Sequence, residues 1–325
     1  MEQPESSESL ETMSTPATTE SPSVAAEGLA HARGQGSLQR RPGGTVSPQA
    51  GAANSCPTCG NGGNSTGPAT LVYAIGRVDP RFPTLCVEKE FAQATGRDST
   101  SGLTDRQTLH AVLSKPENRY LVRQLCWVMS IGGLETYIIY PRDPVDLGLL
   151  VDAVRPEPGP MDLDVVIGLR GPIAPPQMCN GLMLPLVAFD QLYSFDRDSL
   201  IKAIPRPEKT TAKEFAAAAA ELFDRVLQVA DNAGATDEHR ALNYLAVRYP
   251  AIYSTAADAF GRNAALTAVD VRPSPVNGAR NVLDVIFSFT NRATDVVEKS
   301  FVRVDVTEQF PYLVTKMSPY YDRSF

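Results

Sequence analysis

The sequence predicts an α+β fold: a single globular domain with a mixed or antiparallel sheet and several helices. From about residue 55 onwards, Val, Ile, Leu and Phe recur at regular spacing, which is enough for a substantial core. The helical and strand-like patterns are segregated rather than strictly alternating, which favours α+β over α/β. Three segments near the carboxy-terminal end alternate with period two between short polar turns, so we expect an antiparallel meander there.

The first part of the chain has a different composition. Bulky apolar residues are few in the first 66 of the 325 residues and are never adjacent, whereas Ser, Thr, Pro, Gly, Ala and Glu predominate. Such a segment buries too little apolar surface to offset the entropy of ordering it. We therefore divide the chain into a disordered tail or linker over residues 1–54 and a folded domain over residues 55–325.

The elements of the folded part follow from hydrophobic period and from end signals. We expect strands over residues 70–78, 135–141, 161–172, 184–195, 265–273, 280–291 and 298–318. We expect helices over residues 85–96, 103–114, 143–154, 196–204, 212–232 and 236–263, the last interrupted at Pro250. Thr104 is a candidate N-cap, Gly96 a candidate C-cap, and Pro144 stands in a first helical turn. Segment 120–130 is apolar almost all round and is either helix or strand.

Charge and hydropathy exclude several classes of partner. The formal net charge is −7 and no basic patch accumulates, which disfavours binding to nucleic acid. No apolar run approaches the length of a transmembrane helix. The acidic amino terminus, MEQPESSESLETMS, is unlike a signal peptide, so we expect a cytoplasmic protein. Five cysteines in a reducing compartment are expected to be thiols or metal ligands rather than structural disulfides.

The motif Cys56-Pro-Thr-Cys59-Gly60 carries the clearest chemical signal. Two thiolates three residues apart, followed by glycine, are typical of the knuckle turn of zinc ribbons, where both sulfurs face one ion. A redox CxxC would instead stand at a helix start after a strand, and here the loop-like NGGNSTGP follows. Two idle thiols remain the third alternative. We favour zinc.

A structural zinc site needs four ligands, and no second CxxC is present. Cys179 is the best placed partner, because QMCNG puts it two residues before a glycine in an expected loop. Cys126 lies in an apolar segment, where a free cysteine is usually a small buried hydrophobe, and Cys86 lies on an expected helix among charged residues. The predicted ligands are Cys56, Cys59, Cys179 and Cys126, in a closed and therefore structural site.

The histidines offer no persuasive catalytic base. His31 falls in the tail, and His110 lies on what we expect to be a solvated or half-buried helix face. His239 stands in TDEHR at a helix start, where neighbouring acids suit the helix dipole. No HExxH, GxSxG, GxxxxGK[ST] or GxGxxG occurs.

Two pairs of acids are the remaining candidates for acid–base chemistry. Asp162 and Asp164 stand at the beginning of the expected strand 161–172, and Asp196 and Asp198 stand at the beginning of the expected helix 196–204. Pairs in such places are more often turn and cap residues than acid–base dyads. We therefore assign no catalytic residue and no organic cofactor.

From about Cys56 to Arg323 the sequence resembles the carboxy-terminal domain of unknown function in the PatA/PatG type of cyanobactin maturation protease. The resemblance is carried by long blocks such as VYAIGRVDPRFPTL, NRYLVRQLCWV, VVIGLRGPIAPPQMCNGLMLP and PYLVTKMSPYYDR. In that family the domain accompanies subtilisin-like domains that excise and macrocyclise ribosomally made peptides. The chain lacks the Ser turn and the His setting of such a protease, so protease activity does not carry over.

Two hypotheses of function follow. In the first, the chain is a zinc-stabilised, non-catalytic accessory module in ribosomal peptide maturation, which docks a precursor peptide or a partner enzyme along a free sheet edge. In the second, it is a cryptic peptide-modifying enzyme that uses acids such as Asp196 or Asp198 together with His239. A cleft lined by loops 170–182 and 196–207 and by His239 would favour the enzyme.

Overall fold

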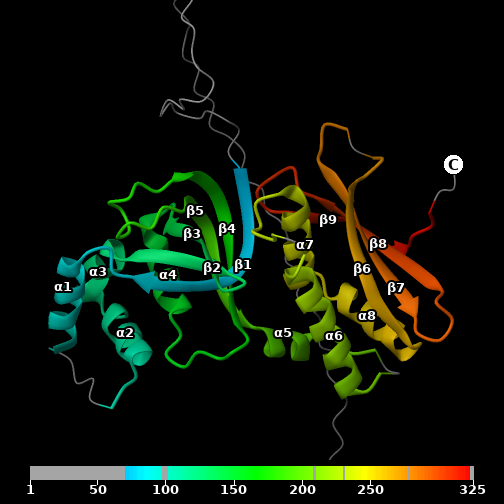
Figure 1. Ribbon diagram of the computed structural model, residues 1–325, viewed down its shortest axis with the longest axis horizontal. Helices are drawn as coiled ribbons and strands as arrows, with labels where there is room; N and C mark the ends of the chain where they lie inside the picture. Colours follow the sequence, from blue (N-terminus) through cyan, green and yellow to red (C-terminus); the bar gives the residue numbers. More distant parts are fainter. Residues whose placement is uncertain (1–69, 97–101, 208–209, 230, 277, 323–325) are drawn as a thin grey trace, which may run out of the picture. The chain divides into compact units, whose positions relative to one another are not determined.

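A computed structural model describes residues 70–96, 102–207, 210–229, 231–276 and 278–322 of the chain (Figure 1). The predicted boundary between residues 54 and 55 lies outside this part. The first half contains β1 (Thr70–Arg81), α1 (Leu85–Gly96), α2 (Asp105–Leu113), α3 (Arg119–Gln124), β2 (Cys126–Ile131), β3 (Leu134–Pro141), α4 (Leu147–Ala153), β4 (Asp162–Ile173) and β5 (Pro185–Asp196). The second half contains α5 (Arg197–Ala203), α6 (Ala212–Leu227), α7 (Asp237–Arg248), α8 (Ala251–Gly261), β6 (Ala264–Pro273), β7 (Val282–Asn291), β8 (Val297–Asp305) and β9 (Tyr312–Pro319).

The first half, from β1 to β5, forms a closed barrel with strand order β1-β2-β3-β5-β4, and we call it the barrel region. The long strand β1 closes it, because residues 70–76 pair with β4 and residues 77–81 pair with β2. Gly76 and Gly168 permit the tight approach of neighbouring strands, since a Cβ at either would collide with the carbonyl oxygen of Ser130 or Ala188. All pairs are antiparallel except β3 with β5.

Helices α1 to α4 are packed on the barrel and share a core with its strands. Thr104 caps α2 in a reciprocal capping box with Gln107, as its sequence predicts. The core that the barrel strands and these helices build together includes Val72, Leu121, Met129, Tyr137, Ile139, Leu150, Val166, Val187 and Phe189.

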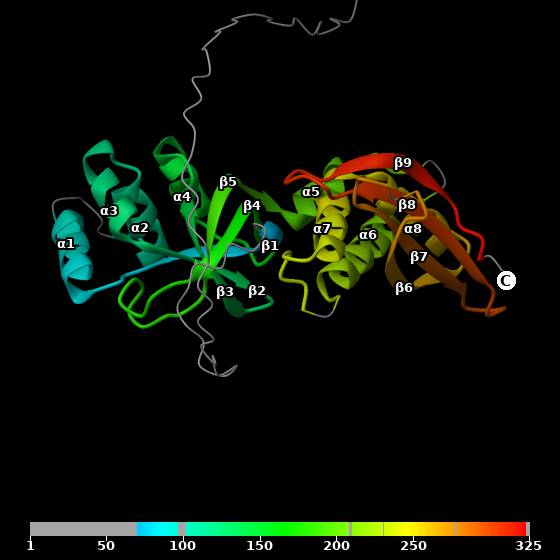
Figure 2. The same cartoon turned by 90° about the horizontal axis from the view of Figure 1, so that it is seen from above.

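The second half, from α5 to β9, is the helix–sheet region. Its sheet has the order β6-β7-β8-β9 and is antiparallel throughout. Helices α6, α7 and α8 lie against one face of this sheet (Figure 2). Alternate residues of β7 and β8, such as Val285, Phe287 and Val302, point into that helical layer and are fully buried.

The two regions share a hydrophobic core. Tyr73 and Ile75 of β1, with Val165 and Ile167 of β4, turn away from the barrel core and join the cluster that contains α6, α7 and α8. Hydrogen bonds tie the same strand to the segment before α7: the Tyr73 N–H donates to the Gly234 carbonyl at 2.9 Å, and Asn243 Nδ2 donates to the Tyr73 carbonyl at 2.8 Å. Strand β1 therefore belongs to both cores.

The α+β class predicted from the sequence is confirmed, and three elements differ from expectation. Segment 120–130 is both helix and strand, because α3 ends at Gln124 and β2 begins at Cys126. Segment 298–318 forms two strands around a turn, whose carbonyls at residues 306 and 309 accept hydrogen bonds from the buried Arg240. The meander thus has four strands rather than three. Helix α6 ends at Leu227, short of the predicted residue 232.

Candidate functional site

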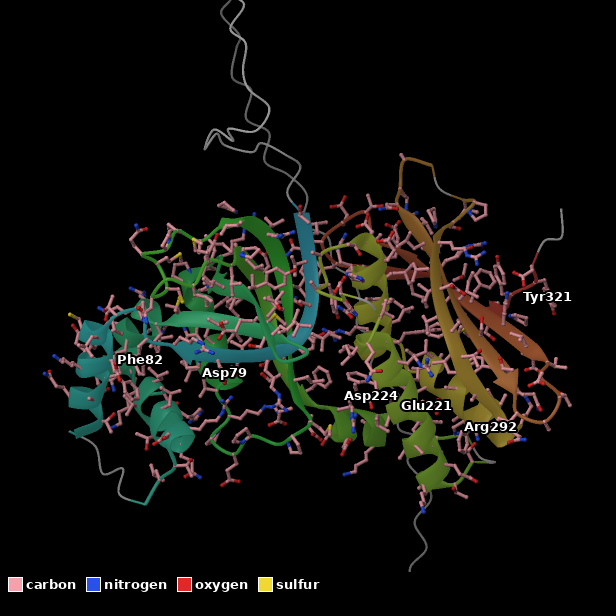
Figure 3. The ribbon with its side chains drawn as sticks, in the orientation of Figure 1. Asp79, Phe82, Glu221, Asp224, Arg292 and Tyr321 are labelled. Carbon is pink, nitrogen blue, oxygen red and sulfur yellow. A yellow bond between two sulfur atoms is a disulfide. The ribbon has the colours of Figure 1, made fainter. Side chains whose placement is uncertain are left out.

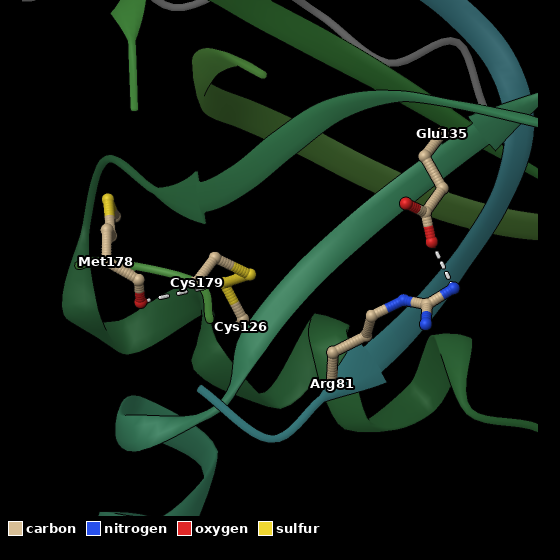
Figure 4. Close-up of a disulfide and its surroundings, with 5 residues drawn as sticks. All are labelled: Arg81, Cys126, Glu135, Met178 and Cys179. Atoms are coloured by element: carbon tan, nitrogen blue, oxygen red, sulfur yellow. Dashed lines mark hydrogen bonds and ion pairs between the residues drawn. A yellow bond between two sulfur atoms is a disulfide. The ribbon is translucent and has the colours of Figure 1, made fainter. Parts of the chain in front are cut away.

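The predicted metal ligands divide into two groups. Cys56 and Cys59 lie outside the described residues. Cys126 stands at the first residue of β2 and Cys179 in the loop between β4 and β5, 53 residues apart in the chain. The fold brings their Cα atoms to 5.8 Å, and the two sulfurs form a disulfide (Figure 4).

The loop that carries Cys179, residues 174–184, is fastened to the outer face of β2 and β3. Its base is closed by a hydrogen bond from the Ala174 N–H to the Leu184 carbonyl at 2.8 Å. Its turn passes through Asn180 and Gly181, both with positive φ (49° and 86°). Glycine and asparagine adopt this left-handed conformation more readily than other residues do. Val128, Ile138 and Ala174 pack with the cysteine pair in a small separate core.

The disulfide corrects one expectation. We predicted that all cysteines are thiols or metal ligands, and for Cys126 and Cys179 this is wrong, because they are bonded to each other and almost fully buried. Sulfurs joined in this way are not thiolate ligands. Within the described residues no group of three or more His, Cys, Asp or Glu side chains is placed to hold a metal ion. Zinc binding by Cys56, Cys59, Cys126 and Cys179 stays a prediction.

The other cysteine and histidine candidates lie apart. Cys86 is a free thiol exposed on α1. His110 is half-buried on α2, as expected, and its Nδ1 lies 3.5 Å from the Ser114 hydroxyl. His239 lies in the first turn of α7, where its backbone N–H donates to the N-cap Thr236, and its Nδ1 is buried without a hydrogen-bond partner in the described part of the chain.

The acid pairs have structural partners. Asp196 is the N-cap of α5 and accepts from the Ser199 N–H at 2.7 Å, and Asp162 accepts from Arg155 and from the Gly159 N–H. These two carboxylates act as the cap and turn groups that their positions predicted.

Asp164 is a buried carboxylate between three strands. It accepts from the Val78 N–H of β1 at 2.7 Å and from the Ser194 hydroxyl of β5 at 2.5 Å. Burial raises its pKa, although the Ser194 and Val78 hydrogen bonds act in the opposite sense. Neither partner is a histidine, so the carboxylate holds neighbouring barrel strands together rather than forming an acid–base pair.

The two pockets nearest these residues do not form the cleft that would favour an enzyme. The pocket next to the disulfide, about 580 Å³, is lined by Cys179, Asn180 and Gly181 together with Arg81 and Glu135. The pocket at the start of α7, about 500 Å³, is lined by Glu238 and Arg240 and not by His239. Neither includes a residue of loop 196–207.

The two ends of the four-stranded sheet differ in accessibility. At β9, the Met317 N–H donates to the hydroxyl of Tyr249, the C-cap of α7, at 2.9 Å. The Tyr244 hydroxyl, also from α7, hydrogen-bonds to the backbone of Leu313; burial raises its pKa and this bond lowers it in part. The β9 edge is therefore covered by tyrosines at two positions on the strand.

The β6 edge is open over its second half. Residues Ala268–Pro273 pair in regular register with β7 on one side. On the other side, no hydrogen bond to residues 268–272 is found in the described part of the chain. A bulge at Leu266–Ala268 and an Arg225 contact to the Leu266 carbonyl occupy only the first half. An open stretch of edge backbone can accept an added strand.

Sequence reasoning found the meander but missed which end is open. Tyr244 and Tyr249 are five residues apart in the sequence, and their spacing gives no sign that they contact β9. The proximity of Cys126 to Cys179 was anticipated as a shared site, although not as a disulfide.

Together these features define an α+β protein in which a closed five-stranded barrel adjoins a helix-covered four-stranded sheet. Residues 209–320 match the family model described as PatG C-terminal. A solved structure named "PatG Domain of Unknown Function" has a similar fold, with a TM-score of 0.64 and 19% sequence identity; the alignment covers 77% of this chain and 98% of that one. A search of curated proteins found no match.

These comparisons confirm the resemblance predicted from the sequence, and the 19% identity of the solved structure shows likeness of fold. The described residues are accounted for by the barrel and helix–sheet regions, and no subtilisin-like protease domain is found among them. None of the described helices is long and apolar enough to cross a membrane.

Proposed function

We propose that this chain is a non-catalytic, zinc-stabilised accessory module in ribosomal peptide natural-product (cyanobactin-like) maturation, which docks a precursor peptide or a partner enzyme. The match of residues 209–320 to the PatG C-terminal model supports the pathway together with the resemblance to cyanobactin maturation proteases, in which such a domain accompanies peptide-processing enzymes. The proposal includes a cytoplasmic location.

The observation that carries the docking function is the open β6 edge. Residues 268–271 are half-exposed, and their backbone groups face β7 on one side only. An extended peptide added there gains main-chain hydrogen bonds, and its alternate side chains lie on the two faces of the sheet. The β9 edge offers no such place, because Tyr249 and Tyr244 already occupy its backbone.

The test uses the precursor peptide encoded beside this chain, together with two backbone-methylated forms. In one form alternate residues of the binding segment are N-methylated, and in the other form the intervening residues are. Strand addition uses the N–H groups of one set only, so we expect one form to lose binding and the other to keep it. Peptide mass should stay unchanged throughout. Equal binding of both forms contradicts strand addition, and a change of mass contradicts the non-catalytic role.

The zinc part of the proposal rests on the cysteine pair. Cys126 and Cys179 lie on different elements, yet their Cα atoms are 5.8 Å apart, a distance that also suits two thiolates on one zinc ion. Cys59 precedes Thr70 by eleven residues, which can span up to about 36 Å when extended. In a reducing compartment the glutathione or thioredoxin pool would supply the two electrons and two protons that convert the disulfide to two thiols. These thiols, with Cys56 and Cys59, would release their protons on binding zinc and complete a tetrahedral thiolate set.

The zinc test compares single variants of the reduced full chain. We expect one zinc per chain by metal analysis after reduction and dialysis. Cys179→Ser should lose the metal, since it removes one of four ligands, whereas Cys86→Ser, an exposed thiol outside the set, should keep it. Full zinc content in Cys179→Ser would show that the partner of the Cys56–Cys59 knuckle is another residue.

A further inference from the structure

The outer face of the sheet, opposite α6 to α8, contains residues that are buried without a helix over them. Asp284, Ile286 and Ser288 of β7 point to this face, yet their exposed fractions are 5%, 2% and 5%. Phe301 and Arg303, on the neighbouring strand β8, stand opposite Ile286 and Asp284 in the ladder. Side chains of the sheet itself therefore wall in the centre of this face.

These walls border a groove of about 820 Å³. Ile286 and Asp284 contribute to its lining, and Phe301 meets Tyr320 edge-to-face with ring centroids 5.6 Å apart. The Tyr320 N–H donates to the Lys299 carbonyl at 2.8 Å. This hydrogen bond fixes the backbone of Tyr320, whose side chain lines the groove. Tyr321, also part of the lining, is 81% exposed (Figure 3).

The charged side chains of the groove differ in how they are paired. Arg303 donates to Asp284 at 2.8 Å and lies over the Phe301 ring at 5.1 Å. Lys299 forms an ion pair with Asp322 at 2.6 Å. Arg272 at the end of β6 lines the groove, and no hydrogen bond or ion pair to it is found in residues 70–322 as far as they are described. An arginine in this state favours a carboxylate ligand.

We propose that this groove binds an extended peptide segment of the docked partner in which an aromatic side chain precedes or follows an acidic residue. The aromatic ring packs against Phe301 and Tyr321, and the carboxylate accepts from the Arg272 guanidinium. The proposal rests on the docking function above and names its ligand. It is continuous with the open β6 edge, because Arg272 is on the outer side of that strand, in register with Asp284.

The ladder sets the spacing between the two contacts. Arg272 and Phe301 are two strands apart across the sheet, and their positions in the ladder differ by two residues along the strands. With strands about 4.8 Å apart and a rise of about 3.4 Å per residue, their Cα atoms are separated by about 12 Å. An extended ligand covers that distance in about three residues. Pro273 and Pro319 border the groove and offer no N–H, so side chains rather than added-strand hydrogen bonds hold the ligand here.

The experiment uses four fluorescein-labelled ten-residue peptides, built on the sequence Gly-Ser-Gly-Phe-Ser-Pro-Glu-Gly-Ser-Gly. The others replace Phe by Ala, Glu by Gln, or both, and binding to the full chain is followed by fluorescence anisotropy up to 1 mM. We expect the Phe/Glu peptide to bind at least five-fold more tightly than either single replacement. Arg272→Gln should abolish the preference for Glu over Gln while keeping that for Phe over Ala, and Tyr321→Ala should do the reverse.

Each outcome decides the proposal. Equal binding of the four peptides, or an unchanged Glu preference in Arg272→Gln, overturns it. If the natural precursor peptide binds to Arg272→Gln as it binds to the unchanged chain, the groove assignment fails while the docking function stands. If the precursor binds to neither protein, the docking function itself fails. A concentration-dependent dimer by analytical ultracentrifugation that is lost in Arg272→Gln would assign the groove to a second copy of the chain and also overturn the proposal.

Discussion

The barrel region and the helix–sheet region solve the same problem, the unpaired edge of a sheet, in different ways. In the barrel, β1 pairs with both β2 and β4, so the sheet closes and leaves no edge. In the helix–sheet region, β9 is covered by tyrosine hydroxyls, whereas the second half of β6 is open. The barrel is therefore suited to be a scaffold, and the sheet is suited to bind.

The two regions are not independent of each other, because they share a core. Tyr73 and Ile75 face the helices of the second region from a strand of the first. The match to the PatG C-terminal family covers residues 209–320 and includes neither β1 nor β4. The matched region is therefore not a complete folding unit in this chain.

The largest expected effect comes from cutting the chain at that boundary. A fragment of residues 209–320 loses Tyr73, Ile75, Val165 and Ile167, which are buried against its helices, and exposes their partners to water. We expect no cooperative unfolding transition for the fragment, whereas residues 64–325 should unfold in one step. Calorimetry and amide NMR spectra provide the measurement. A fragment with dispersed spectra and its own transition would show two independent domains.

The cysteine pair sharpens the scaffold half of the comparison. The disulfide joins residues 53 apart, and a cross-link over a loop of this size stabilises by about 4 kcal/mol in the chain-entropy account. We expect Cys126→Ser to lower the free energy of unfolding by about 2–4 kcal/mol in oxidising buffer without metal. Urea titrations measure it, and a reductant should bring the unchanged protein close to the variant.

The exposed thiol supplies the control for this prediction. Cys86→Ser should change stability by less than about 0.5 kcal/mol, since Cys86 is exposed and unbonded. A loss in Cys86→Ser as large as that in Cys126→Ser would show that the effect does not come from the cross-link.

Local sequence patterns predict most helices and strands of both regions, but they do not predict how the strands of the barrel pair to close it. Period and cap residues located most strands and helices, including Thr104 and Asp196, because those signals are local. The barrel depends on pairings between distant segments, such as Ile138 with Leu186, which no local pattern encodes. The same holds for the candidate site: Cys126 and Cys179 could be proposed as partners from residue type, but their bond and the coverage of β9 by Tyr249 follow from tertiary contacts alone.

The segment that joins the regions depends on one glycine. Gly234 has φ +70°, and a Cβ there would collide with the Tyr73 carbonyl and approach the Ala74 Cα at 2.7 Å. Since backbone atoms cannot move aside cheaply, we expect Gly234→Ala to destabilise by about 3 kcal/mol. The measurement is again urea unfolding.

A second glycine gives the matched control with the opposite sign. Gly148 lies exposed in α4, and a Cβ would meet nothing within 4 Å. Gly148→Ala should therefore stabilise by about 0.5–1 kcal/mol through helix propensity. Two substitutions of equal sign and size would mean that the contact of Gly234 with β1 is not what constrains this position.

The pH dependence of stability distinguishes the two regions. Asp305 in the sheet is 1% exposed; burial alone would raise its pKa, but hydrogen bonds from Thr307, Arg280 and Tyr312 outweigh it and lower the pKa to about 2. The contribution of the Asp305 carboxylate to the free energy of unfolding is therefore complete above pH 3.8, the pKa of the unfolded chain, and is lost as the pH falls through about 2. Asp305→Asn should lower the free energy of unfolding by about 2 kcal/mol at pH 7, and it should make the decrease of that free energy at acid pH less steep.

Asp164 in the barrel should behave in the opposite way. Burial raises the pKa of Asp164 above the value of 3.8 in the unfolded chain. The contribution of this group to the free energy of unfolding is therefore complete below pH 3.8 and declines as the pH rises through the raised pKa. Asp164→Asn, neutral and of the same shape, should remove that decline, so that the variant gains on the unchanged protein as the pH rises from 3 to 7. Urea unfolding at each pH measures both variants, and Glu221→Gln on the exposed side of α6 controls for the loss of one formal charge. Parallel pH profiles for Asp305→Asn and Asp164→Asn would show that the two buried carboxylates are held by their regions in the same way.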